Sequence, residues 1–305
     1  MSHLDAPPDE RATALERHRP KMFGIAYRML GSVEDAEDVV QEAYLRWHQA
    51  EPEDVRSPEA WLVAVVTRIA IDRLRHAAVE RAAYVGPWLP EPLVTSSIPA
   101  ADRSAELTSD LSMAFLLLLE RLTPEERAAL VLREVFDTSY AELARILERN
   151  EAACRQIVHR ARARVRREQR RFQATPADRE QLVERFLAAL AAEDEKALLD
   201  LLADDVVWVS DGGGKAPALR EIVSGAARVA PLAIKFERMG RGRTTHQLVW
   251  LNGELGLLTL ADGLTVHATS FAIAEGRIAA VYRILNPDKL HHVGPPPLWP
   301  MVPRP

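Results

Sequence analysis

Side chains able to contact nucleic-acid bases and phosphates recur along residues 151–171. Arginine can pair with guanine through two hydrogen bonds and glutamine with adenine, so Arg155 and Gln156 suit base readout. Arg162 suits a phosphate contact. Between Arg145 and Arg171 the chain carries ten arginines and three glutamates, although its formal net charge is −5. A basic block within an acidic chain indicates phosphate binding. The predicted DNA-contacting residues are Arg155, Gln156, His159, Arg160 and Arg162.

Two helices joined by a short turn must position these residues. Ser139 followed by Glu142 is a capping-box pattern that predicts a helix start. Asn150 suits the cap of a second helix after a turn at residues 148–150. The second helix carries an apolar face opposite its basic one, with Cys154 as a small core residue. The pattern is typical of a helix-turn-helix, although a solvated, arginine-rich surface helix is the alternative.

An acidic surface is predicted near the N-terminus. Ser32 caps a helix that carries carboxylates or amides on one face. Its first acidic residues suit the helix dipole, but the set exceeds what capping needs. A protein partner and an ordinary solvated face both remain open. The set comprises Glu34, Asp35, Asp38, Gln41 and Glu42.

A third helix begins at Ser57-Pro58, with proline at its first position. Trp61 belongs to its wide apolar stripe and is expected to anchor a core. Basic side chains, including Arg68, Arg73 and Arg75, project elsewhere and suit phosphate contacts.

The acidic helix, the Ala60-Trp61-Leu62 segment and the Ile71-Asp72-Arg73-Leu74-Arg75 segment together resemble region 2 of the extracytoplasmic-function sigma factors of bacterial RNA polymerase. The basic helix-turn-helix resembles region 4 of that family. The resemblance implies that the partners are core RNA polymerase and promoter DNA. It assigns polymerase contact to Asp35, Asp38, Gln41 and Glu42. It assigns −10 promoter contact to Arg56, Arg68, Arg73 and Arg75, and −35 contact to the basic helix.

Residues 177–293 follow a different pattern. Two amphipathic helices precede a series of strands, which predicts an α+β domain with helices packed on a curved antiparallel sheet. Asn252-Gly253 and Glu275-Gly276 are tight-turn pairs between strands. This domain resembles the cone-shaped SnoaL-like fold.

Three motifs resemble those of a sigma-factor branch that carries such a domain at its C-terminus, and they imply regulation in cis. Trp88-Leu89-Pro90-Glu91-Pro92 also favours an extended spacer because prolines alternate in it. The other motifs are Asp211-Gly212-Gly213-Gly214-Lys215 and Asn286-Pro287-Asp288-Lys289-Leu290. The residues expected to regulate are Trp88, Pro90, Pro92, Asp211, Gly212, Gly213, Lys215, Asn286, Pro287, Asp288 and Lys289.

The predicted fold class is therefore multi-domain: two all-α sigma domains, a helix bundle and a helix-turn-helix, followed by an α+β cone-shaped SnoaL-like domain. The expected divisions are region 2 at 10–78, a linker at 79–106, region 4 at 107–171, the SnoaL-like domain at 177–293 and a proline-rich tail at 294–305.

Composition limits the other classes of protein to which the chain could belong. One cysteine excludes an internal disulfide framework and fits a reducing cytoplasm. The apolar runs are too short for a bilayer. We expect no catalytic residues, metal or cofactor. The alternative is a bifunctional protein whose SnoaL-like domain binds or turns over a small molecule, with an acid–base pair such as Asp211 and His267. A DNA-binding repressor or activator that never joins polymerase is a further rival.

Overall fold

The computed structural model describes residues 10–50, 57–95, 111–169 and 176–293. The chain separates into two compact units. The first contains residues 1–78, 100–109 and 119–164, and the second contains residues 79–99, 110–118 and 165–305. The domain bounds expected from the sequence stay predictions. The second unit nevertheless includes the segment at 79–99 and most of the short helix before Leu119.

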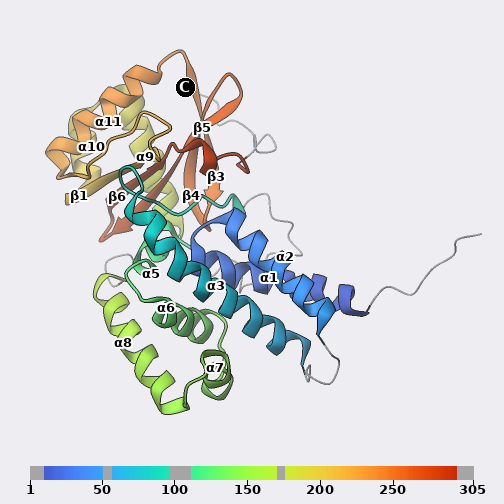
Figure 1. Ribbon diagram of the computed structural model, residues 1–305. Coiled ribbons are helices and arrows are strands. Elements are labelled where there is room, and N and C mark those ends of the chain that lie inside the picture. Colours follow the sequence, from blue (N-terminus) through green and yellow to red (C-terminus); the bar gives the residue numbers. More distant parts are fainter. Residues whose placement is uncertain (1–9, 51–56, 96–110, 170–175, 294–305) are drawn as a thin grey trace, which may run out of the picture. The chain divides into compact units, whose positions relative to one another are not determined.

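The first unit is helical (Figure 1). Its N-terminal half contains α1 (Glu10–Leu30), α2 (Val33–Gln49) and most of α3 (Pro58–Ala82). Its second half contains α6 (Pro124–Leu130), a π-helical turn η3 (Val131–Val135), α7 (Tyr140–Leu147) and most of α8 (Glu151–Gln169).

One buried arginine joins the two halves of this unit. Arg127 on α6 is 3% exposed and donates a hydrogen bond of 2.6 Å to the carbonyl oxygen of Met29 at the end of α1. It also pairs with Glu120 at 2.7 Å. A buried charge is costly unless it is paired, so this contact ties the halves at a defined point.

The second unit is built on a six-stranded sheet with the order β2-β1-β6-β5-β4-β3. Its strands are β1 (Leu202–Asp211), β2 (Val223–Ser224), β3 (Thr244–Leu251), β4 (Glu254–Ala261), β5 (Leu264–Ala274) and β6 (Arg277–Ile284). Strands β3 to β6 form an antiparallel meander, as expected, but β1 pairs with β6 in parallel. The tight-turn pairs are confirmed by positive φ at Asn252, Gly253, Glu275 and Gly276.

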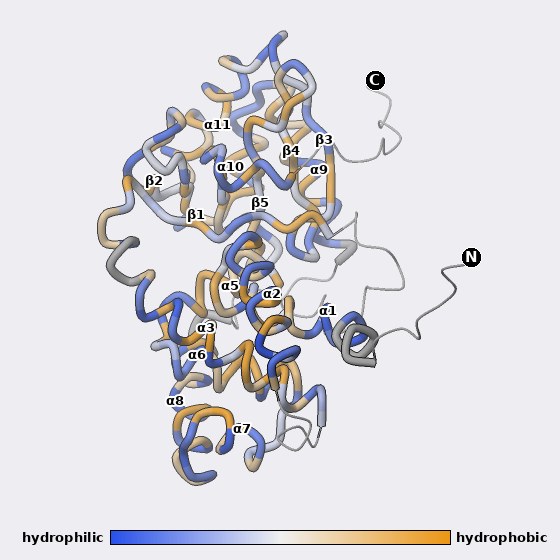
Figure 2. The backbone as a smooth tube through the Cα atoms, turned by 45° about the vertical axis from the view of Figure 1, so that its right-hand side comes forward, coloured by the Kyte–Doolittle hydropathy of each residue, from blue (hydrophilic) through white to orange (hydrophobic). Residues whose placement is uncertain are grey.

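The two faces of the sheet bury different segments. One face packs under α9 (Pro176–Ala192), α10 (Glu195–Leu201) and α11 (Ala226–Gly240), with Trp208, Phe271 and Val281 in the shared core. The opposite face packs against Leu89 from the segment after α3 and against α5 (Met113–Leu119). Figure 2 shows hydrophobic stretches interrupted by hydrophilic ones along these elements, as one-sided burial requires.

The helix α11 was not anticipated from the sequence. It contains Pro231, begins after Gly225 and ends at Gly240, and proline and glycine are residues that usually break a helix. Burial of Val229, Ala230 and Ala233 stabilises it against the sheet. The predicted fold class, two helical sigma domains followed by an α+β cone-shaped domain, is confirmed.

Candidate nucleic-acid interface and linker anchor

The turn before the basic helix forms as its sequence predicts. Ser139 and Glu142 make a reciprocal capping box at the start of α7. Glu148 ends that helix in the left-handed conformation with φ of 56°. The side chain of Asn150 then accepts a hydrogen bond of 2.8 Å from the amide of Ala153, which caps α8. Cys154 is fully buried, as expected of a core residue.

Four of the predicted −35 residues line one open surface recess on α8. Its lining residues are Arg155, Gln156, His159 and Arg160, and all four side chains are exposed. Arg155 pairs with Glu151 at 2.6 Å and lies 5.1 Å from the ring centroid of Tyr140. An exposed pair of this kind contributes little stability and leaves the guanidinium able to exchange partners.

Arg162 lies apart from this recess. Its Nε donates a hydrogen bond of 2.9 Å to Glu134 after α6. That hydrogen bond raises the pKa of Arg162. The contact suits a role in supporting the helix as well as the predicted phosphate contact.

The predicted polymerase-contacting side chains lie together on α2. Asp35, Asp38 and Gln41 are exposed and Glu42 is half-buried. Arg73 from α3 lies 3.6 Å from Asp35, 3.5 Å from Asp38 and 3.5 Å from Glu42. The acidic surface is therefore partly compensated by Arg73, which was expected to contact the −10 element.

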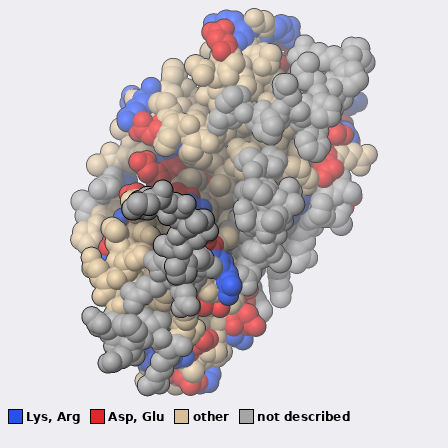
Figure 3. Space-filling view, turned by 90° about the vertical axis from the view of Figure 1, so that its right-hand side faces the viewer, with Lys and Arg blue, Asp and Glu red and all other residues tan. Residues whose placement is uncertain are grey.

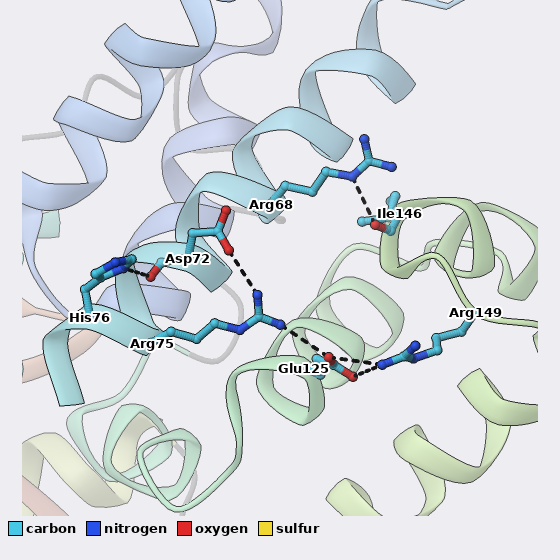
Figure 4. Close-up of polar contacts among 7 residues, drawn as sticks. All are labelled: Arg68, Asp72, Arg75, His76, Glu125, Ile146 and Arg149. Carbon is cyan, nitrogen blue, oxygen red and sulfur yellow. Dashed lines mark hydrogen bonds and ion pairs between the residues drawn. The ribbon is translucent and has the colours of Figure 1, made fainter. Parts of the chain in front are cut away.

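Two further predicted −10 residues contact the second half of the first unit (Figure 4). Arg68 donates hydrogen bonds to the carbonyl oxygens of Ile146 at 3.3 Å and Arg145 at 3.1 Å. Arg75 lies 3.0 Å from Asp72 and 3.4 Å from Glu125. Arg56, the fourth predicted residue, lies outside the described residues.

Glu125, the partner of Arg75, also contacts a second arginine. Arg149, just before the basic helix, also lies 3.4 Å from Glu125 (Figure 4). On the face drawn in Figure 3, basic and acidic side chains of the described residues also lie in small mixed groups. These pairs are exposed, so each contributes about 0–1 kcal/mol.

A second constellation lies within the second unit, where the three sequence motifs meet. Asp211 is fully buried and accepts three hydrogen bonds. The donors are the hydroxyl of Tyr84 at 2.5 Å, the amide of Leu89 at 2.8 Å and Nζ of Lys289 at 2.8 Å. We call Tyr84, Leu89, Asp211, Asn286 and Lys289 the linker anchor.

Lys289 completes the linker anchor from the other side. Its Nζ also donates to the carbonyl oxygen of Leu89 at 2.5 Å, and it lies 4.3 Å from the ring centroid of Trp88. Burial lowers the pKa of Lys289, and the carboxylate of Asp211 opposes that effect. Burial also raises the pKa of Tyr84, and its hydrogen bond to Asp211 adds to the rise.

The glycine turn after Asp211 packs closely on the same residues. A side chain at Gly213 would place Cβ 2.3 Å from Nδ2 of Asn286 and 2.9 Å from the hydroxyl of Tyr84. Gly213 also has φ of 57°. At Gly212 a Cβ would lie 2.5 Å from the carbonyl oxygen of Ala216. The turn is glycine-rich because the backbone approaches its neighbours too closely for other residues.

The glycine turn at residues 211–215 and the segment at residues 286–290 also meet at the surface. Lys215 pairs with Asp288 at 2.5 Å, and both side chains are 57% exposed. Asn286 caps the 3₁₀ turn η4 (Pro287–Lys289), with Pro287 at its start. Nδ2 of Asn286 donates to the hydroxyl of Tyr84 at 2.9 Å.

Residues 84–95, which we call the docked linker, extend from the linker anchor to the edge strand β3. The amide of Leu93 donates to Oδ1 of Asn252 at 3.2 Å, and its carbonyl oxygen accepts from the Asn252 amide at 2.7 Å. Val94 forms an antiparallel bridge with Leu251. Pro90 and Pro92 are buried. The segment is extended, as its prolines predict, but it is packed on the domain rather than acting as a plain spacer.

Sequence reasoning missed two members of this arrangement. Tyr84 lies four residues before Trp88, outside the recognised motif, and its neighbours Ala83 and Val85 give no sign that its hydroxyl has a distant partner. Asn252 was assigned only as a turn residue, although its side chain also holds the docked linker.

The acid–base pair considered for the SnoaL-like domain is not brought together. Asp211 pairs with Ile284 on β6, so the two side chains lie on the same face of the sheet. Arg283 precedes Ile284 and therefore points to the opposite face, together with its partner Thr269 on β5. His267 lies on the Thr269 side, because both residues belong to one alternating series on β5. The side chains of Asp211 and His267 therefore point to opposite faces of the sheet.

Within residues 10–50, 57–95, 111–169 and 176–293, no group of three or more histidine, cysteine, aspartate or glutamate side chains is arranged to hold a metal ion. Among the helices described, none is both long and apolar enough to span a bilayer.

Comparisons with known proteins agree with this organisation. Residues 14–79 match the family Sigma-70 region 2, and residues 112–165 match Sigma-70, region 4. The chain is 38% identical to the ECF RNA polymerase sigma factor SigJ of Mycobacterium tuberculosis, with 90% of this chain and 91% of the relative covered. It is 28% identical to the probable ECF sigma factor SigI of the same species, with 92% and 95% covered.

The crystal structure of Mycobacterium tuberculosis SigJ superposes with a TM-score of 0.75 at 36% sequence identity. The superposition covers 92% of this chain and 98% of SigJ. The similarity thus extends over both helical halves and the sheet domain. This chain belongs to the extracytoplasmic-function sigma factors of RNA polymerase.

Proposed function

We propose that this sigma factor grips promoter DNA at two points and that its SnoaL-like domain restrains that activity in cis through the docked linker. The observation that carries the regulatory part is the linker anchor. In it, Asp211 and Lys289 of the SnoaL-like domain bind the backbone amide and carbonyl of Leu89. A sigma factor works with core polymerase and promoter DNA, so the expected location is the cytoplasm, where both are found.

The −35 contact is assigned to the recess on α8. Arg155 and Gln156 are exposed there beside His159 and Arg160, so four hydrogen-bonding side chains present one surface to a major groove. Removal of a base-reading side chain should relax specificity at one position, whereas removal of a phosphate contact should weaken binding to every sequence.

The polymerase contact is assigned to the exposed carboxylates and amide of α2. Asp38 and Glu42 are four residues apart on one helix face. Arg73 lies 3.5 Å from each and partly neutralises their charges. A basic partner could replace Arg73 at little cost, because such exposed pairs contribute about 0–1 kcal/mol. Arg73 would then become available to DNA.

The contacts of the docked linker explain how the SnoaL-like domain would restrain the sigma domains. In the family, the segment between regions 2 and 4 is expected to thread toward the polymerase active centre. Residues 89–95 cannot do so while Leu89, Leu93 and Val94 are bonded to the SnoaL-like domain. The contacts of Arg68 and Arg75 with the region-4 half occupy two more side chains assigned to the promoter.

The test of the sigma-factor assignment is binding to core polymerase by full-length protein. Combined Asp38→Lys and Glu42→Lys substitutions should abolish the complex. The control is Glu195→Lys with Asp200→Lys, which makes the same charge change at exposed positions in the second unit. Equal polymerase binding by wild type and the α2 variant would contradict the assigned surface. Specific DNA binding without any polymerase complex would instead favour a repressor or activator.

We also infer that the chain performs no covalent chemistry. Asp211, the strongest carboxylate candidate, is fully engaged by Tyr84, Leu89 and Lys289, and His267 is on the other face of the sheet. A general acid or base must reach its substrate, and Asp211 is buried under the docked linker.

A further inference from the structure

A cluster of polar side chains interrupts the helix-covered face of the sheet. Cross-strand pairs place side chains on the same face, and Arg283 is paired with Ser210 on β1 and with Thr269 on β5. Thr259 on β4 pairs with both His246 and His267. The same face carries the apolar core under α9 and α11. A polar cluster at this position has no role in the contacts of the linker anchor, which lies on the opposite face.

Arg283 is the charged centre of this cluster. The residue is 8% exposed, and its guanidinium lies 5.3 Å from the ring centroid of Trp208 and 4.9 Å from that of Phe236. Its Nη2 donates a hydrogen bond to Nε2 of His267 at 2.8 Å. Among the described residues, no carboxylate forms an ion pair with it. Buried arginines are ordinarily paired with an anion, so this one lacks its usual partner.

The neighbours of Arg283 do not neutralise it. Burial lowers the pKa of Arg283 to about 10, so it remains charged at neutral pH. Burial, together with the charge of Arg283, lowers the pKa of His267 to about 2, so His267 is neutral. Glu237, the carboxylate that acts on Arg283 from a distance, is hydrogen-bonded to His246 at 3.1 Å.

We propose that Arg283 binds the carboxylate of a small organic acid, whose apolar part contacts the rings of Trp208 and Phe236. A planar guanidinium matches a carboxylate through two parallel hydrogen bonds, and burial strengthens that pairing relative to water. The two aromatic rings, with centroids 5.8 Å apart, favour an aromatic or aliphatic acid over inorganic phosphate. This binding does not depend on the proposed restraint by the docked linker.

The experiment measures ligand binding to the full-length protein by titration calorimetry, with benzoate and hexanoate as probes. Benzyl alcohol tests whether the charge is needed, and inorganic phosphate tests whether an apolar part is needed. We expect benzoate, hexanoate or both to bind with low affinity. Benzyl alcohol and inorganic phosphate should each bind at least about tenfold more weakly.

Two variants locate the site. Arg283→Met should weaken carboxylate binding about tenfold or more, because it removes the cation while keeping an apolar side chain of similar length. Arg277→Met is the matched control, since Arg277 is on the same strand but is 50% exposed and paired with Asp204. It should change affinity less than twofold. If Arg283→Met does not fold, Arg283→Lys keeps a charge and should bind measurably but more weakly.

Three outcomes would overturn the proposal. The first is that neither carboxylate binds at millimolar concentration. The second is that phosphate binds more tightly than both carboxylates. The third is that Arg283→Met or Arg283→Lys binds as tightly as the wild-type protein.

Discussion

Replacement of Asp211 by asparagine is the most informative perturbation of the linker anchor. The side chain keeps its shape but loses its charge, and Lys289 remains buried at 7% exposure. The asparagine oxygen can still accept from Leu89 and Lys289, but the hydroxyl of Tyr84, which already accepts from Nδ2 of Asn286, loses its acceptor. Two of the three hydrogen bonds to residue 211 are therefore retained, and the main loss is the negative charge that compensates Lys289.

The loss of this charge sets the expected change in the free energy of unfolding. Breaking a buried ion pair by neutralising one partner costs about 3–5 kcal/mol. Because the hydrogen bonds survive in part, we expect Asp211→Asn to lower the free energy of unfolding of the second unit by about 3 kcal/mol. Adding Lys289→Met removes the uncompensated cation and should recover part of the loss.

The assay is urea unfolding of the full-length protein, together with amide hydrogen exchange of residues 84–95. Asp288→Asn is the control, because Asp288 pairs with Lys215 at the surface, where both are 57% exposed. That substitution should cost less than about 1 kcal/mol and leave exchange in the docked linker unchanged. A cost for Asp211→Asn no larger than that of Asp288→Asn would refute the account of the linker anchor.

Three further predictions concern single sites. Gly213→Ala should cost about 2–4 kcal/mol, from left-handed strain and collision with its neighbours. Gly263→Ala, with φ of 79° and nothing within 4 Å of its Cβ, should show the strain alone in the same unfolding assay. The folded pKa of His267 is about 2, below the unfolded value of 6.5, so its stability contribution is complete above pH 6.5 and falls as the pH drops. The loss should reach about 2 kcal/mol at pH 5, and it should vanish in His267→Asn but persist in His159→Asn when urea unfolding is compared at pH 8 and pH 5. Glu125→Gln should change the unfolding free energy by less than about 1 kcal/mol but should increase promoter DNA binding by the polymerase complex in a filter-binding assay. Unchanged DNA binding would show that the Glu125 contacts do not restrain the protein.

Much of the helical fold is predictable from local chemistry. The capping boxes at Thr123 and Ser139, and the cap at Ser32, start their helices where the sequence places them. These signals act within four residues, so a single sequence contains all the information they need. The two glycine-containing turns Asn252-Gly253 and Glu275-Gly276 are predictable for the same reason.

The arrangements that escaped prediction depend on distant residues. Helix α11 forms despite Pro231 because the sheet buries its apolar face. The parallel pairing of β1 with β6 joins residues about seventy positions apart, such as Trp208 and Val281. Strand patterning shows which residues alternate but does not specify the neighbouring strand.

The candidate sites divide in the same way. The recess on α8 was predictable because its four residues belong to one helix face. The linker anchor was only partly predictable, since the motifs marked Asp211 and Lys289 but gave no sign of Tyr84, 127 residues away from its partner Asp211. Arg73 was assigned to DNA, and its contact with Asp38, 35 residues away, depends on how α2 and α3 pack.

We infer that the docked linker must leave the SnoaL-like domain before the protein initiates transcription. Val94 and Leu251 form an antiparallel bridge, so Val94→Cys with Leu251→Cys should permit a disulfide that locks the linker in place. Cys154, the native cysteine, is buried and leaves this pairing undisturbed.

The measurement is promoter-directed transcription by core polymerase with this double variant, before and after reduction. We expect the oxidised protein to be inactive and reduction to restore activity to that of the wild type. Equal transcription by the oxidised and reduced forms would contradict this inference.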